Sequence, residues 1–135
     1  MPSFTENENW IAAKSIAIRC AGLSLLQESD LAKARLNSLQ SLAIGLMSAL
    51  TSKPTAGILG SSEMLMAVNK CRYVQSELLL MSELGDIDSG TADSLVQEAE
   101  VLFERLRDLV NQSLADKQKL MASRMSSLGL DLEQI

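Results

Sequence analysis

Basic side chains toward the C-terminus are the residues whose type and spacing suit a defined chemistry, the binding of phosphate groups. Arg105 and Arg107 lie two positions apart. A weakly basic strip follows them along the chain, formed by Lys117, Lys119 and Arg124. Cationic side chains neutralise the phosphates of nucleic acids, so these five residues are the candidate nucleic-acid contact. Single-strand binding by base stacking is disfavoured, because no aromatic side chains alternate with the cations.

The closely spaced basic pairs also have a structural interpretation. Lys70 and Arg72 have the same spacing as Arg105 and Arg107. The expected partners are carboxylates on exposed helix faces, namely Glu77, Glu104 and Asp108. Pairs three or four residues apart on a helix meet on its surface. Surface salt bridges are therefore the favoured interpretation of both basic pairs.

Histidine is absent from the 135 residues, and this absence limits the reactions that the chain can catalyse. It removes the commonest general base, the commonest zinc ligand and the usual partner of a catalytic Ser or Cys. Cys20 and Cys71 have neither CxxC spacing nor a His partner, and we expect them as buried free thiols. The chain is therefore expected to be non-enzymatic, with no cofactor and no metal.

Acidic residues dominate the stretch between Glu63 and Glu100, and the net charge of the whole chain is −5. A cation site could be imagined from the carboxylates of Glu77, Glu83, Asp86 and Asp88. The turn from Gly85 to Gly90 is too short for the oxygen-rich loop of an EF-hand. We therefore expect a solvated acidic end of the protein, which would repel nucleic acid and favour a protein partner.

The first two elements that must position these groups are amphipathic helices. A capping box of Thr5 and Glu8 is expected to begin the first helix, which runs to about Gln27. Its principal apolar stripe is Ile11, Ile18 and Leu25, and an adjacent stripe is formed by Trp10, Ala13, Ala17, Cys20 and Ala21. Ser29 or Asp30 caps the second helix. Its apolar face is Leu36, Leu39, Ala43, Leu46 and Leu50.

Two further helices follow a connection at 51–61, and Ser61 or Ser62 is expected to cap the first of them. This third helix has the most regular face, formed by Met64, Ala67, Cys71, Val74, Leu78 and Met81. Gly85 ends it in a left-handed conformation. Ser89 or Thr91 begins the fourth helix, which meets no helix-breaking residue before Gly129. Its two stripes are Leu95, Ala99, Leu102, Leu106, Leu109 and Ser113, and Val96, Phe103 and Val110.

Four amphipathic helices with mostly short connections predict an all-α fold, an antiparallel up-down-up-down four-helix bundle with a C-terminal extension. The expected bundle covers 1–127, and an apolar tail covers 128–135. The tail places Leu128, Leu130, Leu132 and Ile135 among polar residues. That alternation suits a docking peptide or an added strand, and a frayed terminus is the alternative. No secretory signal and no membrane-spanning run is evident, so we expect a cytoplasmic protein that does not bind membranes.

One segment carries a family resemblance. The run QSELLLMSELGDID, Gln75 to Asp88, preceded by AVNKCRYV, resembles the third helix and following turn of bacterial four-helix-bundle proteins encoded in 23S rRNA intervening sequences. The matching positions are Ala67, Val74, Leu78, Leu79, Leu84, Gly85, Ile87 and Asp88. The family's motif near the end of the second helix is present only as SLAIGLMSAL, without its Pro, Asn and Glu.

The resemblance implies an assembly and a class of partner. A related protein, the accessory variability determinant of diversity-generating retroelements, has the same bundle, assembles as a ring-shaped pentamer and looks like a basic partner of a reverse transcriptase and its RNA. By this resemblance the chain is a homo-oligomer, with a pentamer as one candidate, and a reverse transcriptase is a candidate protein partner. The family has no established catalytic residues to carry over.

Two functional hypotheses follow. The leading one is a non-enzymatic oligomeric accessory or adaptor protein that acts through protein–protein contacts, because the first and fourth helices have more apolar stripes than one neighbour can cover. The alternative is a nucleic-acid-binding accessory subunit of a reverse transcriptase, of the diversity-generating retroelement type, or an rRNA-associated protein. The acidic charge of the chain disfavours this alternative.

Overall fold

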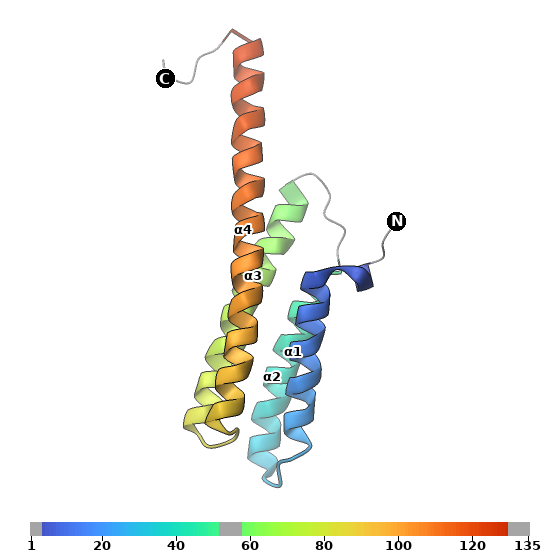
Figure 1. Ribbon diagram of the computed structural model, residues 1–135, viewed down its shortest axis with the longest axis vertical. Coiled ribbons are helices and arrows are strands. Elements are labelled where there is room, and N and C mark those ends of the chain that lie inside the picture. The colour runs from blue at the N-terminus through green and yellow to red at the C-terminus, as the bar shows by residue number, and fades with distance from the viewer. Residues whose placement is uncertain (1–3, 52–57, 130–135) are drawn as a thin grey trace.

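The computed structural model describes residues 4–51 and 58–129, and within these ranges the chain is an all-α four-helix bundle. A short 3-10 turn, η1, covers Phe4–Glu6. The four α-helices are α1, Glu8–Ser24; α2, Asp30–Ala49; α3, Ile58–Glu83; and α4, Ser89–Ser127. They run antiparallel in up-down-up-down order, as the sequence predicts, and α4 continues well beyond the other three helices (Figure 1).

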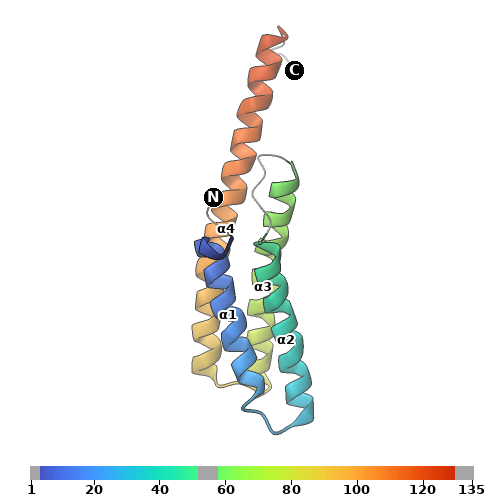
Figure 2. The same ribbon diagram turned by 90° about the vertical axis from the view of Figure 1, so that its right-hand side faces the viewer.

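The neighbour relations place α1 and α3 on one diagonal of the bundle. α1 packs against α2 and α4, and α3 packs against the same two helices. The side view shows this arrangement, with α1 and α2 in front of α4 and α3 (Figure 2). The outward sides of α1 and α3 therefore lie on opposite flanks of the molecule.

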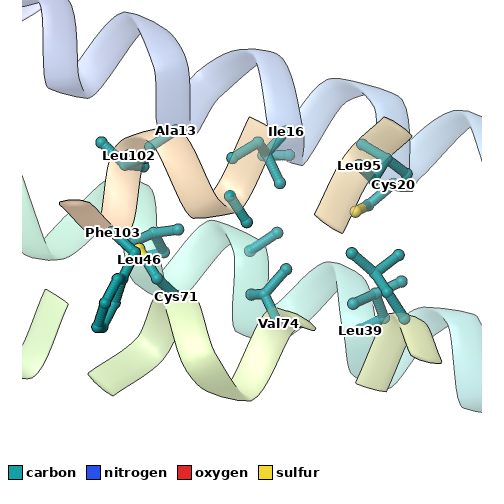
Figure 3. Packing of buried hydrophobic residues seen from close by; sticks show 14 of the residues in the cluster. Ala13, Ile16, Cys20, Leu39, Leu46, Cys71, Val74, Leu95, Leu102 and Phe103 are labelled. Carbon is teal, nitrogen blue, oxygen red and sulfur yellow. The ribbon is translucent and has the colours of Figure 1, made fainter. Parts of the chain in front are cut away.

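The core is a single cluster of aliphatic side chains with two cysteines and one Phe. Leu39 and Leu46 from α2, Val74 from α3 and Leu102 from α4 have no exposed surface and lie along this core (Figure 3). The predicted faces of α2 and α3 are confirmed, with Leu50 and Met64 half-buried at their ends. Residues three and four positions apart share one side of a helix, which is why these patterns locate the core.

The principal stripe predicted for α1 is wrong. Ile11, Ile18 and Leu25 are 49%, 60% and 85% exposed, and the core side of α1 is formed by Ala13, Ile16, Ala17 and Cys20. Both stripes have helical spacing, so periodicity alone does not choose between them. The side of α1 that carries Ala13, Ile16, Ala17 and Cys20 packs against α2 and α4, and the Ile11, Ile18 and Leu25 side is left on the outside.

The predicted ends of the helices need three corrections. Asn7 caps α1 in place of a Thr5–Glu8 box, since its Oδ1 accepts hydrogen bonds from the backbone N–H groups of Asn9 at 2.8 Å and Trp10 at 3.4 Å. α1 ends at Ser24, before Gln27. α3 begins at Ile58, so Ser61 and Ser62 lie within the helix and do not cap it. A Ser, Thr or Asn side chain can cap a helix only at the residue where the chain enters the helix. The conformation of the preceding loop determines which residue that is.

Other predicted boundaries are confirmed. Ser29 caps α2, and Ser89 is the first residue of α4, where the Asp88 carboxylate accepts from the backbone N–H of Thr91 at 3.2 Å. Gly85 and Gly129 have φ angles of +78° and +79°, the left-handed conformation in which glycine ends a helix.

Candidate functional site

The end of α4 is the most distinctive surface of the molecule. Val110 is the last buried residue of this helix, and every residue from 111 to 127 is exposed or half-buried. We call residues 111–127 the α4 arm. It projects beyond the bundle by about 25 Å, at roughly 1.5 Å per residue, and no other described helix runs beside its outer part (Figures 1 and 2).

The α4 arm is amphipathic although the bundle does not cover it. Leu114, Leu120 and Met121 are between 49% and 63% exposed. Leu114 and Met121 follow Val110 at helical spacing, so the side of α4 that faces the core continues into the arm. A helix with one apolar side needs a partner for that side. The arm is therefore a surface built for contact.

The structure separates the five predicted basic residues. Lys117 and Arg124 are seven residues apart and share the apolar side of the arm, whereas Lys119 lies two positions from Lys117 and faces elsewhere. Arg105 and Arg107 lie in the bundle part of α4, also on different sides of the helix. A single surface that includes all five cations is thus not formed by one copy of the chain.

Arg107 makes its contacts within α4. The guanidinium of Arg107 lies 3.9 Å from the Asp108 carboxylate and 5.6 Å from the centre of the Phe103 ring. On the arm, the Asp116 carboxylate accepts a hydrogen bond from the Gln112 side chain at 3.0 Å. The arm carries Asp116 against Lys117, Lys119 and Arg124, which gives it a net charge of +2.

The expected solvated acidic end is wrong for Asp86. This carboxylate is 6% exposed and accepts two hydrogen bonds from the Arg35 guanidinium, at 2.5 and 2.7 Å. The hydrogen bond from Arg35 holds the pKa of Asp86 below its usual range. The Gln27 side chain donates to the Asp86 carbonyl at 2.5 Å. Together these contacts fasten the α1–α2 connection and α2 to the turn between α3 and α4.

Arg72 also has a different partner from the one expected. Its guanidinium pairs with Glu100 on α4 at 2.6 Å, not with Glu77, and stacks over the Phe103 ring at 3.6 Å. Gln75 donates to Glu100 at 2.8 Å and to the Val96 carbonyl at 3.1 Å. The hydrogen bonds from Gln75 and Arg72 lower the pKa of Glu100. This cluster joins α3 to α4, so Arg72 is occupied by a structural contact.

The two cysteines are buried free thiols, as predicted. Burial raises the pKa of Cys20 to about 11 and that of Cys71 to about 12. A thiol with so high a pKa remains protonated at neutral pH and is a poor nucleophile or metal ligand. No group of three or more His, Cys, Asp or Glu side chains within 4–51 and 58–129 is arranged to hold a metal ion.

Two outer helix faces expose further large apolar side chains. The α1 face consists of Ile11, Ile18 and Leu25, which recur every seven residues. The α3 face consists of Leu65, Met66, Tyr73, Leu80 and Leu84, each between 50% and 59% exposed. Sequence reasoning missed the α3 face, although Met66, Tyr73 and Leu80 also recur every seven residues. The more regular core stripe on the same helix masks this second repeat.

The predicted tail is only partly described. Leu128 is 75% exposed just after the arm, whereas Leu130, Leu132 and Ile135 lie outside the described residues.

None of the helices, over the residues described, is both long enough and apolar enough to pass through a bilayer. Comparison of the chain with models of protein families, with curated proteins and with solved structures finds no match in any of the three.

Proposed function

We propose that this chain is a non-enzymatic accessory or adaptor protein that assembles with copies of itself and uses the α4 arm to bind a protein partner. The observation that carries the proposal is the amount of apolar surface outside the closed core. Three separate surfaces have it: the α1 face, the α3 face and the α4 arm. Soluble monomers rarely expose large contiguous apolar patches, and such patches mark interaction sites.

The chemistry of the α4 arm indicates the kind of partner it fits. Its apolar side carries Leu114 and Met121 together with Lys117 and Arg124. An amphipathic helix of this kind binds a hydrophobic groove, and its cations favour a groove with carboxylates at the rim. The partner is thus a protein with an apolar and acidic surface.

The family resemblance of the third-helix segment supports the same proposal. It favours a ring-shaped homo-oligomer, with a pentamer as a candidate, and a reverse transcriptase as a candidate partner. The buried free thiols Cys20 and Cys71 suit a reducing compartment such as the cytoplasm.

Light scattering coupled to size-exclusion chromatography tests the self-association. We expect the molar mass of the full chain at micromolar concentration to be a multiple of 14.6 kDa, and to fall toward that value on dilution. A constant monomer mass across the micromolar range would reject the proposal.

A second candidate function is binding of nucleic acid through the α4 arm, and the net charge of +2 on the arm favours it. RNA binding should then weaken steeply with salt. Changing Lys117, Lys119 and Arg124 to Gln should reduce the salt slope by about 0.7–0.9 for each phosphate that is no longer neutralised. A matched control changes Lys14 and Lys33, which lie on α1 and α2, to Gln. Failure of the unaltered chain to retain RNA at low salt would exclude this function.

A further inference from the structure

We propose that the α4 arm of one copy binds the opposite end of the bundle of a second copy. We call this opposite end the base and define it as residues 25–35 and 83–93, which surround the α1–α2 connection and the α3–α4 turn. The arm and the base lie at the two ends of the molecule (Figure 1). The inference rests on the proposed function, and it identifies the partner of the arm as another copy of the chain.

The base is one connected surface, although two separate parts of the sequence form it. The Gln27 side chain donates to the Asp86 carbonyl at 2.5 Å, and the Arg35 guanidinium donates to the Asp86 carboxylate. Four leucines lie within four positions of these three residues and are between 52% and 85% exposed: Leu25, Leu26, Leu31 and Leu84. The base therefore exposes large apolar side chains beside the contacts that join its two parts.

The base is also acidic. It contains six carboxylates and two cations, which gives it a net charge of −4. Arg35 and Asp86 neutralise each other, and the other charged side chains of the base are all exposed: Glu28, Asp30, Lys33, Glu83, Asp88 and Asp93. A surface that is apolar and acidic suits an amphipathic helix that carries cations on its apolar side.

The outer part of the α4 arm is such a helix. No Asp or Glu lies between Lys117 and Gly129, and the net charge of the arm is +2. Met121 and Leu128 are 63% and 75% exposed, and with Arg124 they share the apolar side of the arm. Arm against base joins apolar side chains and opposite charges, whereas two arms or two bases would bring like charges together.

The arm cannot reach the base of its own copy. α4 is one continuous helix, from Ser89 in the base to Ser127 at the end of the arm. At roughly 1.5 Å per residue, the arm begins about 32 Å from Ser89 and extends away from it. An arm bound to a base therefore comes from a second copy. Because the two surfaces differ, the contact is heterologous, and it forms a ring when its rotation closes and an open chain of copies when it does not.

The outer part of the arm also lies away from the carboxylates of the bundle that carries it. Asp108 is the last acidic residue in the bundle part of α4, and Arg124 lies about 24 Å beyond it along the helix. Exposed charges more than about 8 Å apart are largely screened at physiological salt. The acidic base of a second copy would thus meet the cations of the arm, and those distant carboxylates would oppose it little.

Two substitutions damage one surface each. Met121→Glu places a carboxylate on the apolar side of the arm, and Leu31→Lys places an ammonium group in the base. Light scattering over a dilution series should show that each raises the dissociation constant of the assembly by at least about 30-fold, the size of a hot-spot loss. Ile44→Glu on α2 is the matched control and should leave assembly unchanged, because Ile44 is 43% exposed and belongs to neither surface. Circular dichroism checks that each variant keeps its helices.

Mixing the two damaged variants gives the sharpest result. Met121→Glu retains an intact base, and Leu31→Lys retains an intact arm, so an equimolar mixture should form a one-to-one dimer although each variant alone is monomeric. A mixture that stays monomeric, or loss of assembly in only one variant, would overturn the contact between arm and base. If both variants assemble as the unaltered chain does, these surfaces are not the interface, while the proposed self-association stands. If the unaltered chain is monomeric, both proposals fail.

A shortened chain separates the arm from the residues that follow it. Asp131 and Glu133 lie outside the described residues, and a chain that ends at Gly129 lacks both carboxylates. Since the arm and the base are unaltered in it, this chain should assemble at least as tightly as the full chain. Weaker assembly would show that the contact is made by residues 130–135, and the inference about the arm would be wrong.

Discussion

The two halves of α4 contain similar apolar residues in very different surroundings. In the bundle part, Leu95, Leu102 and Leu106 have no exposed surface. In the α4 arm, Leu114 and Met121 are half-exposed or more. The helix, its spacing and its apolar side are continuous across the boundary at Val110. What changes is whether neighbouring helices reach that height, so the same pattern stabilises the fold in one half and leaves a contact surface in the other.

The largest effect is expected where the packing is complete. Val74 has no exposed surface, and Val74→Asp buries a carboxylate without a partner in the core. We expect a loss of about 4 kcal/mol or more, enough to unfold a domain of ordinary stability. Circular dichroism during thermal unfolding measures this. Asn69→Asp, on the exposed side of α3, is the control, and an unchanged melting temperature in Val74→Asp would show that the core face of α3 is wrong.

A matched pair of leucines on α4 measures the contrast itself. Leu106→Ala removes a fully buried side chain and should lower the free energy of unfolding by about 2–5 kcal/mol. Leu114→Ala removes a side chain from the arm and should change it by less than about 0.5 kcal/mol at concentrations where the chain is monomeric. Urea denaturation gives both values. Equal losses would mean that the arm is packed as well as the bundle.

The sequence predicts the fold well because residues three and four positions apart report on one helix side. The faces of α2 and α3 and the long extent of α4 follow from such local information. Local information wrongly predicts that the α1 face is buried. Two stripes on α1 have helical spacing, and only the positions of α2 and α4 determine which of them lies in the core. The Arg35–Asp86 pair joins residues 51 positions apart, which no local pattern reveals. Likewise, the local pattern gives the length of α4 but does not show that α4 extends beyond the ends of the neighbouring helices.

The Arg35–Asp86 ion pair stabilises the end of the bundle opposite the arm. The stability of the protein should therefore decrease in acid. Arg35 lowers the pKa of Asp86 in the folded protein from the ordinary value of 3.8. The unfolded chain therefore binds the proton first as the pH falls, so the stabilisation is complete above that value and is lost at lower pH. We expect the melting temperature to fall below about pH 4, with a shallower fall in Asp86→Asn. Parallel curves for the two proteins would contradict this role of Asp86.

Removal of the α4 arm should have the smallest effect on the free energy of unfolding. This truncation tests most directly whether the arm stabilises the fold or is available to bind a partner. A chain that ends at Ser113 lacks most of the α4 arm and the tail. Urea denaturation of the monomer should give a free energy of unfolding within about 0.5 kcal/mol of the full chain, since none of the described residues that are removed, 114–129, is buried. A loss of about 2 kcal/mol or more would show that the arm packs against its own bundle and is not available as a surface for a partner.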